Sequence, residues 1–501
     1  MNARTSSAGK QAVRPAAPFP DAPAVLKSLG QFRSGQIRVL YIFPFQRLDK
    51  NRWEAWRQID VELQLKKGSE SSHSAAWRHP KNPAIELMRD RKIKKPASTT
   101  TPTLAQVDGT PANLAQVKIT VDRDGIYQVR YEDLVDAGVE LPEGLDPWEL
   151  RLTNKGHEVP FYIVDHEDRS FDRGDYIEFY GEFSRAPKNP EAPDVYLDIY
   201  STQNVYWLAW NQGQGQKMIE EEGLVLETDP SKFRTVYSFP SKVHFEQDRH
   251  FDRLGRYQKQ IPRDHWFMDR GVFSSEKKDY ALDLPDPDTQ SDQPVELRIM
   301  LHGQTFSDSL PHTVEAFLNQ RLVLHGSWFG QTPFLLSASA AQSINANTLN
   351  ERKNTVTLVN RAPEDRVDNF FVNWIEVTYP RLLKAHQGYL EFTIPRDEPE
   401  GLFDFTISGF STDQISLYKL GASKIIGADI EAIEDALGNR TYQVHFQDEV
   451  LTRNVRYVAV EEAAKLKPIS IQPHEPVDLR DPALAADYVV IAYDSLLQSE
   501  P

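Results

Sequence analysis

The chain has 501 residues, 40% of them hydrophobic and 11% aromatic, so it can bury several cores at about 100–200 residues per domain. Acidic residues outnumber basic ones by 73 to 57, and the resulting net charge of −16 argues against a nucleic-acid-binding protein. The absence of cysteine excludes disulfides, thiolate metal sites and a cysteine nucleophile within these residues. No stretch approaches the ~20 apolar residues of a membrane span, and residues 1–30 lack the apolar core of a secretory signal peptide.

The first 115 residues show one patterned segment between two unpatterned ones. Residues 1–36 are rich in Ala, Ser, Pro and Gly without a period, which predicts a mostly disordered N-terminus. Within 37–67, the alternation of residues 39–45 and 59–65 predicts a β-hairpin with one buried face. A lone hairpin is marginally stable, so we expect it to dock on the next domain. Residues 68–115 resemble a linker, which is either a solvated connector or a processing site for a protease that prefers Arg or Lys.

Residues 116–238 are predicted to form an all-β domain. Residues 117–121 and 126–131 are expected to be strands joined by a turn at 122–125, and 132–138 a short helix ended by Gly138. Turn signals at short intervals separate the further strands, which favours a β-sandwich. These strands are expected at 149–153, 159–164, 176–180 and 204–210.

Residues 239–474 continue in the same style and are predicted to form a jelly-roll-like β-sandwich domain. Around Ile430, Ile433 and Leu437 the apolar spacing suits a helix, but Gly438-Asn439 suits a hairpin turn, and we favour the hairpin. The expected strands are 295–301, 313–318, 355–359, 371–379, 389–394, 403–408, 415–419, 442–446 and 455–460. The predicted fold class is therefore mainly β.

Residues 475–501 are predicted to begin a further domain. Residues 486–494 are apolar on both faces, which is typical of a strand buried inside a parallel sheet. Such a strand needs neighbouring strands and covering helices. Either this strand pairs with a strand upstream in the chain, or it opens a domain whose remainder is missing from this chain.

Common catalytic signatures are absent from the sequence. We find no His-Glu-x-x-His zinc motif, Gly-x-Ser-x-Gly elbow, phosphate-binding loop or dinucleotide fingerprint. His302 and His325, each followed by glycine at a predicted strand end, could serve as a base but have no thiol to activate. Turn histidines without a catalytic role are the simpler interpretation.

Two acidic groups could bind a cation. The first lies in one loop, whose oxygens could hold calcium although the spacing is not that of an EF-hand. Its members are Asp165, Asp168, Asp172 and Asp175. The second group consists of Glu246, Asp248, Asp252 and Asp264. Because Arg249 and Arg253 are interleaved with it, we expect a structural ion-pair network there rather than a metal site.

Tryptophans on or beside predicted strands could bind sugars, because exposed indoles stack on glycans, although such rings more often belong to a core. These residues are Trp207, Trp210, Trp266, Trp328 and Trp374. Among them Trp328 and Trp374 are the candidates for a glycan-binding surface. A stand-alone adhesion or glycan-binding protein is thus one hypothesis for the function.

Six sequence blocks are distinctive in combination. Two of them are Asp124-Gly-Ile-Tyr-Gln-Val-Arg-Tyr131 and Asp172-Arg-Gly-Asp-Tyr-Ile-Glu-Phe-Tyr-Gly181. The others are residues 204–208, 244–248, 264–267 and 373–380. Together these blocks resemble the gingipain family of cysteine peptidases. The hairpin within 37–67 is similar to the family's pro-segment, and residues 484–491 resemble the first strand of its caspase-like peptidase domain.

This resemblance implies the N-terminal, non-catalytic part of a secreted or cell-surface peptidase, of the kind that includes the type IX secretion sortase. In that family the catalytic His and Cys lie in the α/β domain that follows the strand at 484–491. No catalytic residue is therefore assigned here, and whether this chain alone is an enzyme stays open. The implied partners are the missing C-terminal peptidase domain and the protein substrates of the intact enzyme.

Overall fold

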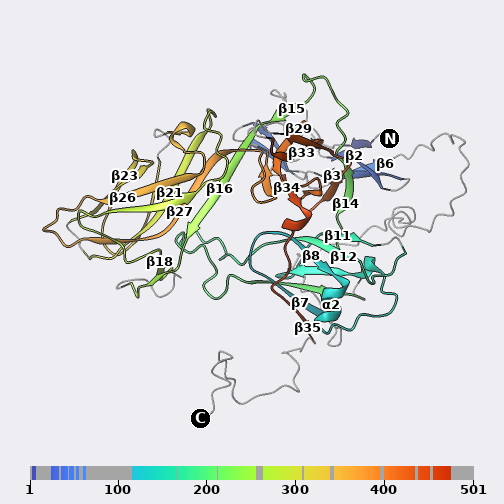
Figure 1. Cartoon of the computed structure of the whole chain (residues 1–501), viewed down its shortest axis with the longest axis horizontal. Coiled ribbons are helices and arrows are strands. Elements are labelled where there is room, and N and C mark those ends of the chain that lie inside the picture. The colour runs from blue at the N-terminus through green and yellow to red at the C-terminus, as the bar shows by residue number, and fades with distance from the viewer. Residues whose placement is uncertain are drawn as a thin grey trace, which may run out of the picture. The chain divides into compact units, whose positions relative to one another are not determined.

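The structure is a computed structural model that describes residues 116–474, apart from 166–167, 212, 255–262, 307–309, 339–342, 395–399, 435–437 and 452–454. It also gives the backbone of six strands before residue 64. The chain divides into two compact units, Met1–Ala112 and Asn113–Pro501, and each is considered by itself. The described structure is mainly β, as predicted (Figure 1). No helix among the described residues is long and apolar enough to span a membrane.

In the first unit, each strand has one antiparallel partner. The strands are β1 (Ala3–Ser6), β2 (Ala24–Phe32), β3 (Gly35–Ile42), β4 (Phe45–Asp49), β5 (Arg52–Ala55) and β6 (Asp60–Leu63). The pairs are β1 with β6, β2 with β3 and β4 with β5.

Two sequence-based predictions for this unit are wrong. Strands β1 and β2 lie in residues 1–36, which were expected to be disordered. The described strands do not form the expected hairpin between 39–45 and 59–65, because β3 pairs with β2 and β6 pairs with β1. Alternation shows which side chains share a face, but it does not name the partner strand. The predicted linker at 68–115 and the predicted strand at 486–494 lie outside the described residues.

Two facing sheets form what we call the first sandwich. Its elements are β7 (Gln116–Val121), β8 (Gly125–Arg130), α2 (Tyr131–Asp136), η1 (Pro147–Glu149), β9 (Arg151–Asn154), β10 (His157–Glu158), β11 (Phe161–Val164), β12 (Tyr176–Gly181), β13 (Asn204–Ala209) and β35 (Ser470–His474). The sheets run β10-β9-β13-β7-β35 and β11-β12-β8. In Figure 1, β35 lies beside the cyan strands although it comes from the far end of the described chain. Val117, Ile119, Tyr127, Phe179 and Leu208 lie in the common core.

The short helix after β8 confirms one prediction, and the turn before β8 corrects another. Helix α2 ends close to Gly138, whose φ of +80° suits glycine. Residues 122–125 were expected to return the chain beside the preceding strand. Instead β7 and β8 belong to different sheets, so this turn crosses the sandwich. Turn residues indicate that the chain reverses its direction. They do not show whether the two flanking strands pair with each other or pack face to face in different sheets.

A second sandwich packs two sheets around another core. One sheet runs β16-β27-β21-β24 and the other β20-β26-β22-β23. The elements are β16 (Ser238–Glu246), β19 (Val272–Phe273), β20 (Lys277–Asp283), β21 (Pro294–Gly303), β22 (His312–Leu318), β23 (Arg321–Trp328), β24 (Pro333–Ser337), β25 (Ile344–Asn345), η2 (Ala346–Thr348), β26 (Lys353–Asn360) and β27 (Asn369–Leu382). Leu297, Val314, Val356 and Ile375 belong to its core. The long strands β16, β27 and β21 lie side by side (Figure 1).

A third sandwich is built from the sheets β14-β31-β30-β34-β28 and β15-β29-β33-β32. Its elements are β14 (Ile219–Glu222), β15 (Arg234–Val236), β28 (Tyr389–Thr393), β29 (Gly401–Phe410), β30 (Ile415–Lys419), β31 (Ser423–Ile426), β32 (Asp429–Glu434), β33 (Arg440–Val450), β34 (Arg456–Glu461) and η3 (Glu462–Ala464). Strands β32 and β33 pair antiparallel, which confirms the predicted hairpin.

The three cores do not follow the predicted division of the chain. Residues 239–474, expected to form one domain, contribute to the separate cores of the second and third sandwiches. Strands β14 and β15 precede residue 239, yet they pair in parallel with β31 and β29 of the third sandwich. Strand spacing predicts that strands exist, whereas sheet membership depends on contacts that are distant in sequence.

Candidate metal centre

The aspartates of the first acidic group shape the loop between β11 and β12. Asp175 is buried, and its Oδ2 accepts a hydrogen bond from the Asp172 backbone N–H at 2.8 Å. Asp168 Oδ1 accepts one from the Ser170 backbone N–H at 2.9 Å. Within the described residues, no three carboxylates of Asp165, Asp168, Asp172 and Asp175 lie within 4.8 Å of one another. Calcium binding by this loop therefore stays a prediction, without a cluster of ligands to support it.

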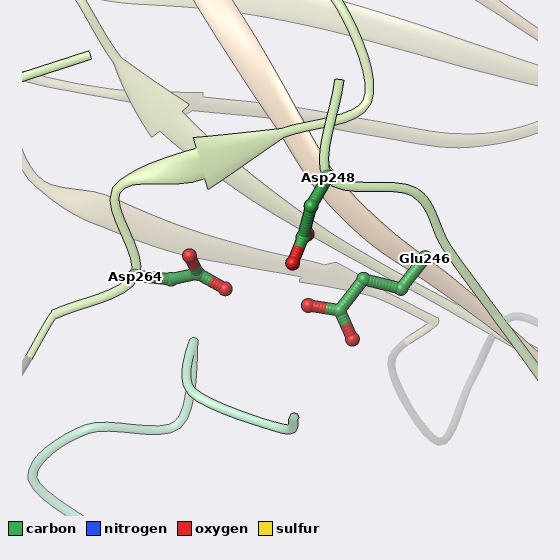
Figure 2. A group of neighbouring side chains, drawn as sticks. All are labelled: Glu246, Asp248 and Asp264. Atoms are coloured by element: carbon green, nitrogen blue, oxygen red, sulfur yellow. The ribbon is translucent and has the colours of Figure 1, made fainter. Parts of the chain in front are cut away.

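Three carboxylates of the second acidic group do come together. Glu246 ends β16, Asp248 follows in the next loop, and Asp264 precedes β18 (Trp266–Phe267). One oxygen from each lies within 4.8 Å of the others. Figure 2 shows the three carboxylates turned toward a common centre.

The predicted ion-pair network with arginine is wrong for these carboxylates. In the part of the chain that the structure describes, no salt bridge joins Arg249 or Arg253 to any of the three, and the salt-bridge partner of Glu246 is His244. Asp252 stays apart from the cluster, because its Oδ1 accepts a hydrogen bond from the Leu254 backbone N–H at 2.7 Å. The two arginines are close to the acidic residues in the sequence, but this closeness does not produce ion pairs in the fold.

Pairing between short strands places Asp264 opposite the other two acids. Strand β17 (His250–Phe251) pairs antiparallel with β18, and β16 pairs with β27 so that Glu246 lies opposite Trp374. The Asp264 backbone N–H donates to Asp194 Oδ2 at 3.2 Å, and Asp264 Oδ1 accepts from the Trp266 backbone N–H at 2.8 Å. These bonds fix the Asp264 carboxylate at the cluster.

Of the basic groups near the cluster, Arg263 is bound to an acid outside it, and His244 lies between one cluster member and an outside glutamate. Arg263 Nη1 lies 3.0 Å from Asp194 Oδ1. His244 Nε2 lies 2.7 Å from Glu246 Oε2, while His244 Nδ1 lies 3.3 Å from Glu376 Oε1. Burial lowers the pKa of His244, but its hydrogen bonds to the two glutamates outweigh this effect and raise the pKa above its usual value. Among the described residues, one oxygen of the three-carboxylate cluster, Glu246 Oε2, therefore has a basic partner.

Crowding and burial make all three carboxyl groups harder to ionise. Burial raises the pKa of Asp264 to about 6, and the neighbouring Glu246 charge adds to the increase. Burial also raises the pKa of Glu246, where the His244 contact opposes it, and that of Asp248. Binding a proton or a cation would relieve the repulsion between these carboxylates.

Two buried oxygens beside the cluster have no hydrogen-bond donor among the described residues. They are Glu246 Oε1, on a side chain only 2% exposed, and Asn373 Oδ1 in β27. The Asn373 side chain hydrogen-bonds Asp264, and its Nδ2 donates to the Trp266 carbonyl at 3.3 Å. Asn373 was not predicted as a site residue, because a lone asparagine within a strand carries no sequence signal for a ligand.

The two tryptophans proposed to bind glycans are buried. Trp328 is 7% exposed and stacks on Phe334, with 4.7 Å between ring centroids and 5° between ring planes. Trp374 is 3% exposed and packs near His244. Neither ring presents a face to a sugar, so the prediction for these residues is wrong. Alternation along a strand cannot say which of its two faces is covered by a second sheet.

Trp328 and Trp374 differ in hydrogen bonding, which gives a testable contrast. Trp374 Nε1 donates to the Asp194 carbonyl at 3.3 Å, whereas Trp328 Nε1 has no partner among the described residues. Both Trp→Phe changes remove similar volume. We expect Trp374→Phe to be less stable than Trp328→Phe by about 1–2 kcal/mol, the value of a hydrogen bond lost to a buried acceptor. Urea unfolding of both variants measures the difference, and equal stabilities would contradict it.

No protein-family model and no curated protein sequence matches this chain. Among solved structures, it is similar to dimeric latent PorU from Porphyromonas gingivalis at 14% identity and a TM-score of 0.48, over 71% of this chain and 33% of PorU. It thus spans about a third of the length of that protein. A carbohydrate-binding module, CBM36, in complex with calcium and xylotriose is 14% identical with a TM-score of 0.18, over 27% of this chain and 98% of the module.

Proposed function

We propose that this chain is the N-terminal, non-catalytic part of a gingipain-like secreted cysteine peptidase. The observation that carries the proposal is the set of sequence blocks between residues 124 and 380 that together resemble that family. The chain contains no cysteine and so cannot supply the thiolate of such a peptidase. Its role in the intact protein would be to support the peptidase domain.

The positions of these blocks suit a supporting role. Residues 124–131 include β8 and residues 172–181 include β12, and these two strands pair along their whole length. Residues 373–380 lie in β27, the strand that pairs with both β16 and β21. The blocks therefore include the central strand β12 of the β11-β12-β8 sheet and the interior strand β27 of the second sandwich, each of which pairs with a strand on both sides.

An activity comparison tests the proposal. This chain alone should cleave no protein or peptide in a way that is sensitive to a thiol-directed inhibitor. The chain joined to the sequence that follows Pro501 in its own reading frame should show such cleavage. A reading frame that supplies no α/β domain with a Cys and a His would overturn the proposal, as would inhibitor-sensitive cleavage by this chain alone.

A further inference from the structure

We propose that Glu246, Asp248 and Asp264 bind one calcium ion at the point where β16 ends and β18 begins (Figure 2). The inference is independent of the proposed peptidase relationship, because it concerns only side chains that this chain itself brings together. The ion would connect two segments that are separated in the sequence.

The spacing of the three carboxylates suits a calcium ion. Calcium binds oxygen ligands at about 2.3–2.6 Å, so two oxygens bound to one ion lie at most about 5 Å apart. The three carboxylate oxygens here lie within 4.8 Å of one another. An ion at their common centre can therefore contact all three without a large movement of the backbone.

Unbalanced charge and an unpartnered oxygen both favour a cation over a purely structural cluster. His244 contacts Oε2 of Glu246 and a glutamate outside the cluster, and the guanidinium of Arg263 is bound to Asp194. Glu246 Oε1 is buried without a donor among the described residues, and leaving such an oxygen unsatisfied costs about 1–3 kcal/mol. A bound cation would satisfy this oxygen. A single proton shared between Glu246 and Asp264 would leave the charge of the neighbouring Asp248 without a salt bridge from any described residue.

The ligand types select calcium among the common metals. Every proposed protein ligand is an oxygen, there is no cysteine, and both ring nitrogens of His244 contact glutamates. Zinc would be expected to use nitrogen or sulfur ligands. Magnesium demands near-ideal octahedral geometry at shorter distances, whereas calcium accepts irregular sets of six to eight oxygens. Asp248 is exposed, so water can reach the ion and complete its shell.

Terbium luminescence on the chelator-treated full chain tests the proposal directly. Trp266 follows Asp264 by two residues and should sensitise a Tb³⁺ ion bound at the cluster. We expect Tb³⁺ to saturate one site and Ca²⁺ to displace it at lower concentration than Mg²⁺. Trp266→Phe should lose most of the luminescence while keeping calcium binding by isothermal titration calorimetry.

Matched variants separate this site from general attraction to an acidic surface. Asp248→Asn and Glu246→Gln should weaken calcium binding at least about tenfold, because each removes a charged ligand. Asp252→Asn, from the same acidic stretch but outside the cluster, should bind like the unmodified chain. Asp248 is exposed, so its variant should fold, which circular dichroism can verify. Failure of the chain to bind millimolar calcium, or equal affinities for Asp248→Asn and Asp252→Asn, would overturn the proposal.

Discussion

Glu178→Gln is expected to destabilise the chain by about 3–5 kcal/mol, the cost of breaking a buried ion pair by removing one partner. Glu178 lies in β12 with a fully buried side chain. Its oxygens accept from Lys465 Nζ at 2.5 Å, Tyr418 Oη at 2.6 Å and Lys424 Nζ at 3.0 Å. Burial raises the pKa of Glu178, but the two lysines outweigh it and hold the pKa below its ordinary value, so the carboxylate is charged in the fold.

The buried ion pairs and hydrogen bond of Glu178 join two sandwiches, so their loss should also weaken the cooperative unfolding of these sandwiches. Glu178 belongs to the first sandwich, while Tyr418 and Lys424 lie in β30 and β31 of the third. Apolar contacts of Ile126 with this region reinforce the junction. We therefore expect Glu178→Gln to lower the urea concentration at the midpoint of unfolding, followed by tryptophan fluorescence. We also expect the first and third sandwiches to unfold in two separate transitions.

Glu182→Gln is the matched control for this experiment. Glu182 lies just beyond β12, where its half-exposed side chain is 3.5 Å from Arg456, and such pairs contribute less than about 1 kcal/mol. The double variant with Glu178→Gln and Lys465→Met should lose less stability than the two single variants lose in sum. The reason is that Lys465→Met removes a buried charge that has already lost its partner in Glu178→Gln. Equal stabilities of Glu178→Gln and Glu182→Gln would contradict the assignment.

Because of His302, the free energy of unfolding should fall as the pH is lowered from about 6.5 to 4. This residue in β21 is 4% exposed, and burial lowers its pKa from 6.5 to about 4 despite a 2.9 Å contact from Nδ1 to the Gly303 carbonyl. Between those values the unfolded chain takes up a proton that the folded chain does not, so acid favours unfolding. The full shift corresponds to about 3 kcal/mol lost by pH 4.

The difference between variants isolates His302 from other titrating groups. His302→Asn should flatten the dependence of unfolding free energy on pH between 4 and 6.5, measured by urea unfolding at several pH values. His325→Asn changes an exposed histidine of β23 and should leave the slope unchanged. If the unmodified chain and His302→Asn show the same slope, the burial of His302 has no energetic consequence and the prediction fails.

Local structure could be predicted from the sequence where short-range chemistry decides it. Helix α2 with its Gly138 end and the β32–β33 hairpin both depend on residues a few positions apart. Partner strands could not be predicted, because the pairing of β35 with β7 or β14 with β31 joins distant segments that alternation does not distinguish.

The candidate site shows the same limit. Glu246, Asp248 and Asp264 could be recognised as an acidic group in the sequence, but not as a converging one. Their meeting depends on the pairing of β17 with β18 and of β16 with β27. Burial likewise separates Trp328 and Trp374, which are covered, from Trp266, which is 44% exposed, although all five candidate tryptophans share the same strand-like surroundings.

Strand β35 has a consequence for the order in which the protein can fold. It completes the five-stranded sheet of the first sandwich by pairing with β7, and Leu466 just before it exchanges backbone hydrogen bonds with Ile126 and Gln128. During synthesis the first sandwich therefore stays incomplete, because one edge of β7 has no partner until the ribosome has synthesised β35. An unpaired edge is open to association with other chains. Of the three sandwiches, the first begins earliest in the chain but is completed last, when residues 466–474 pair with its strands.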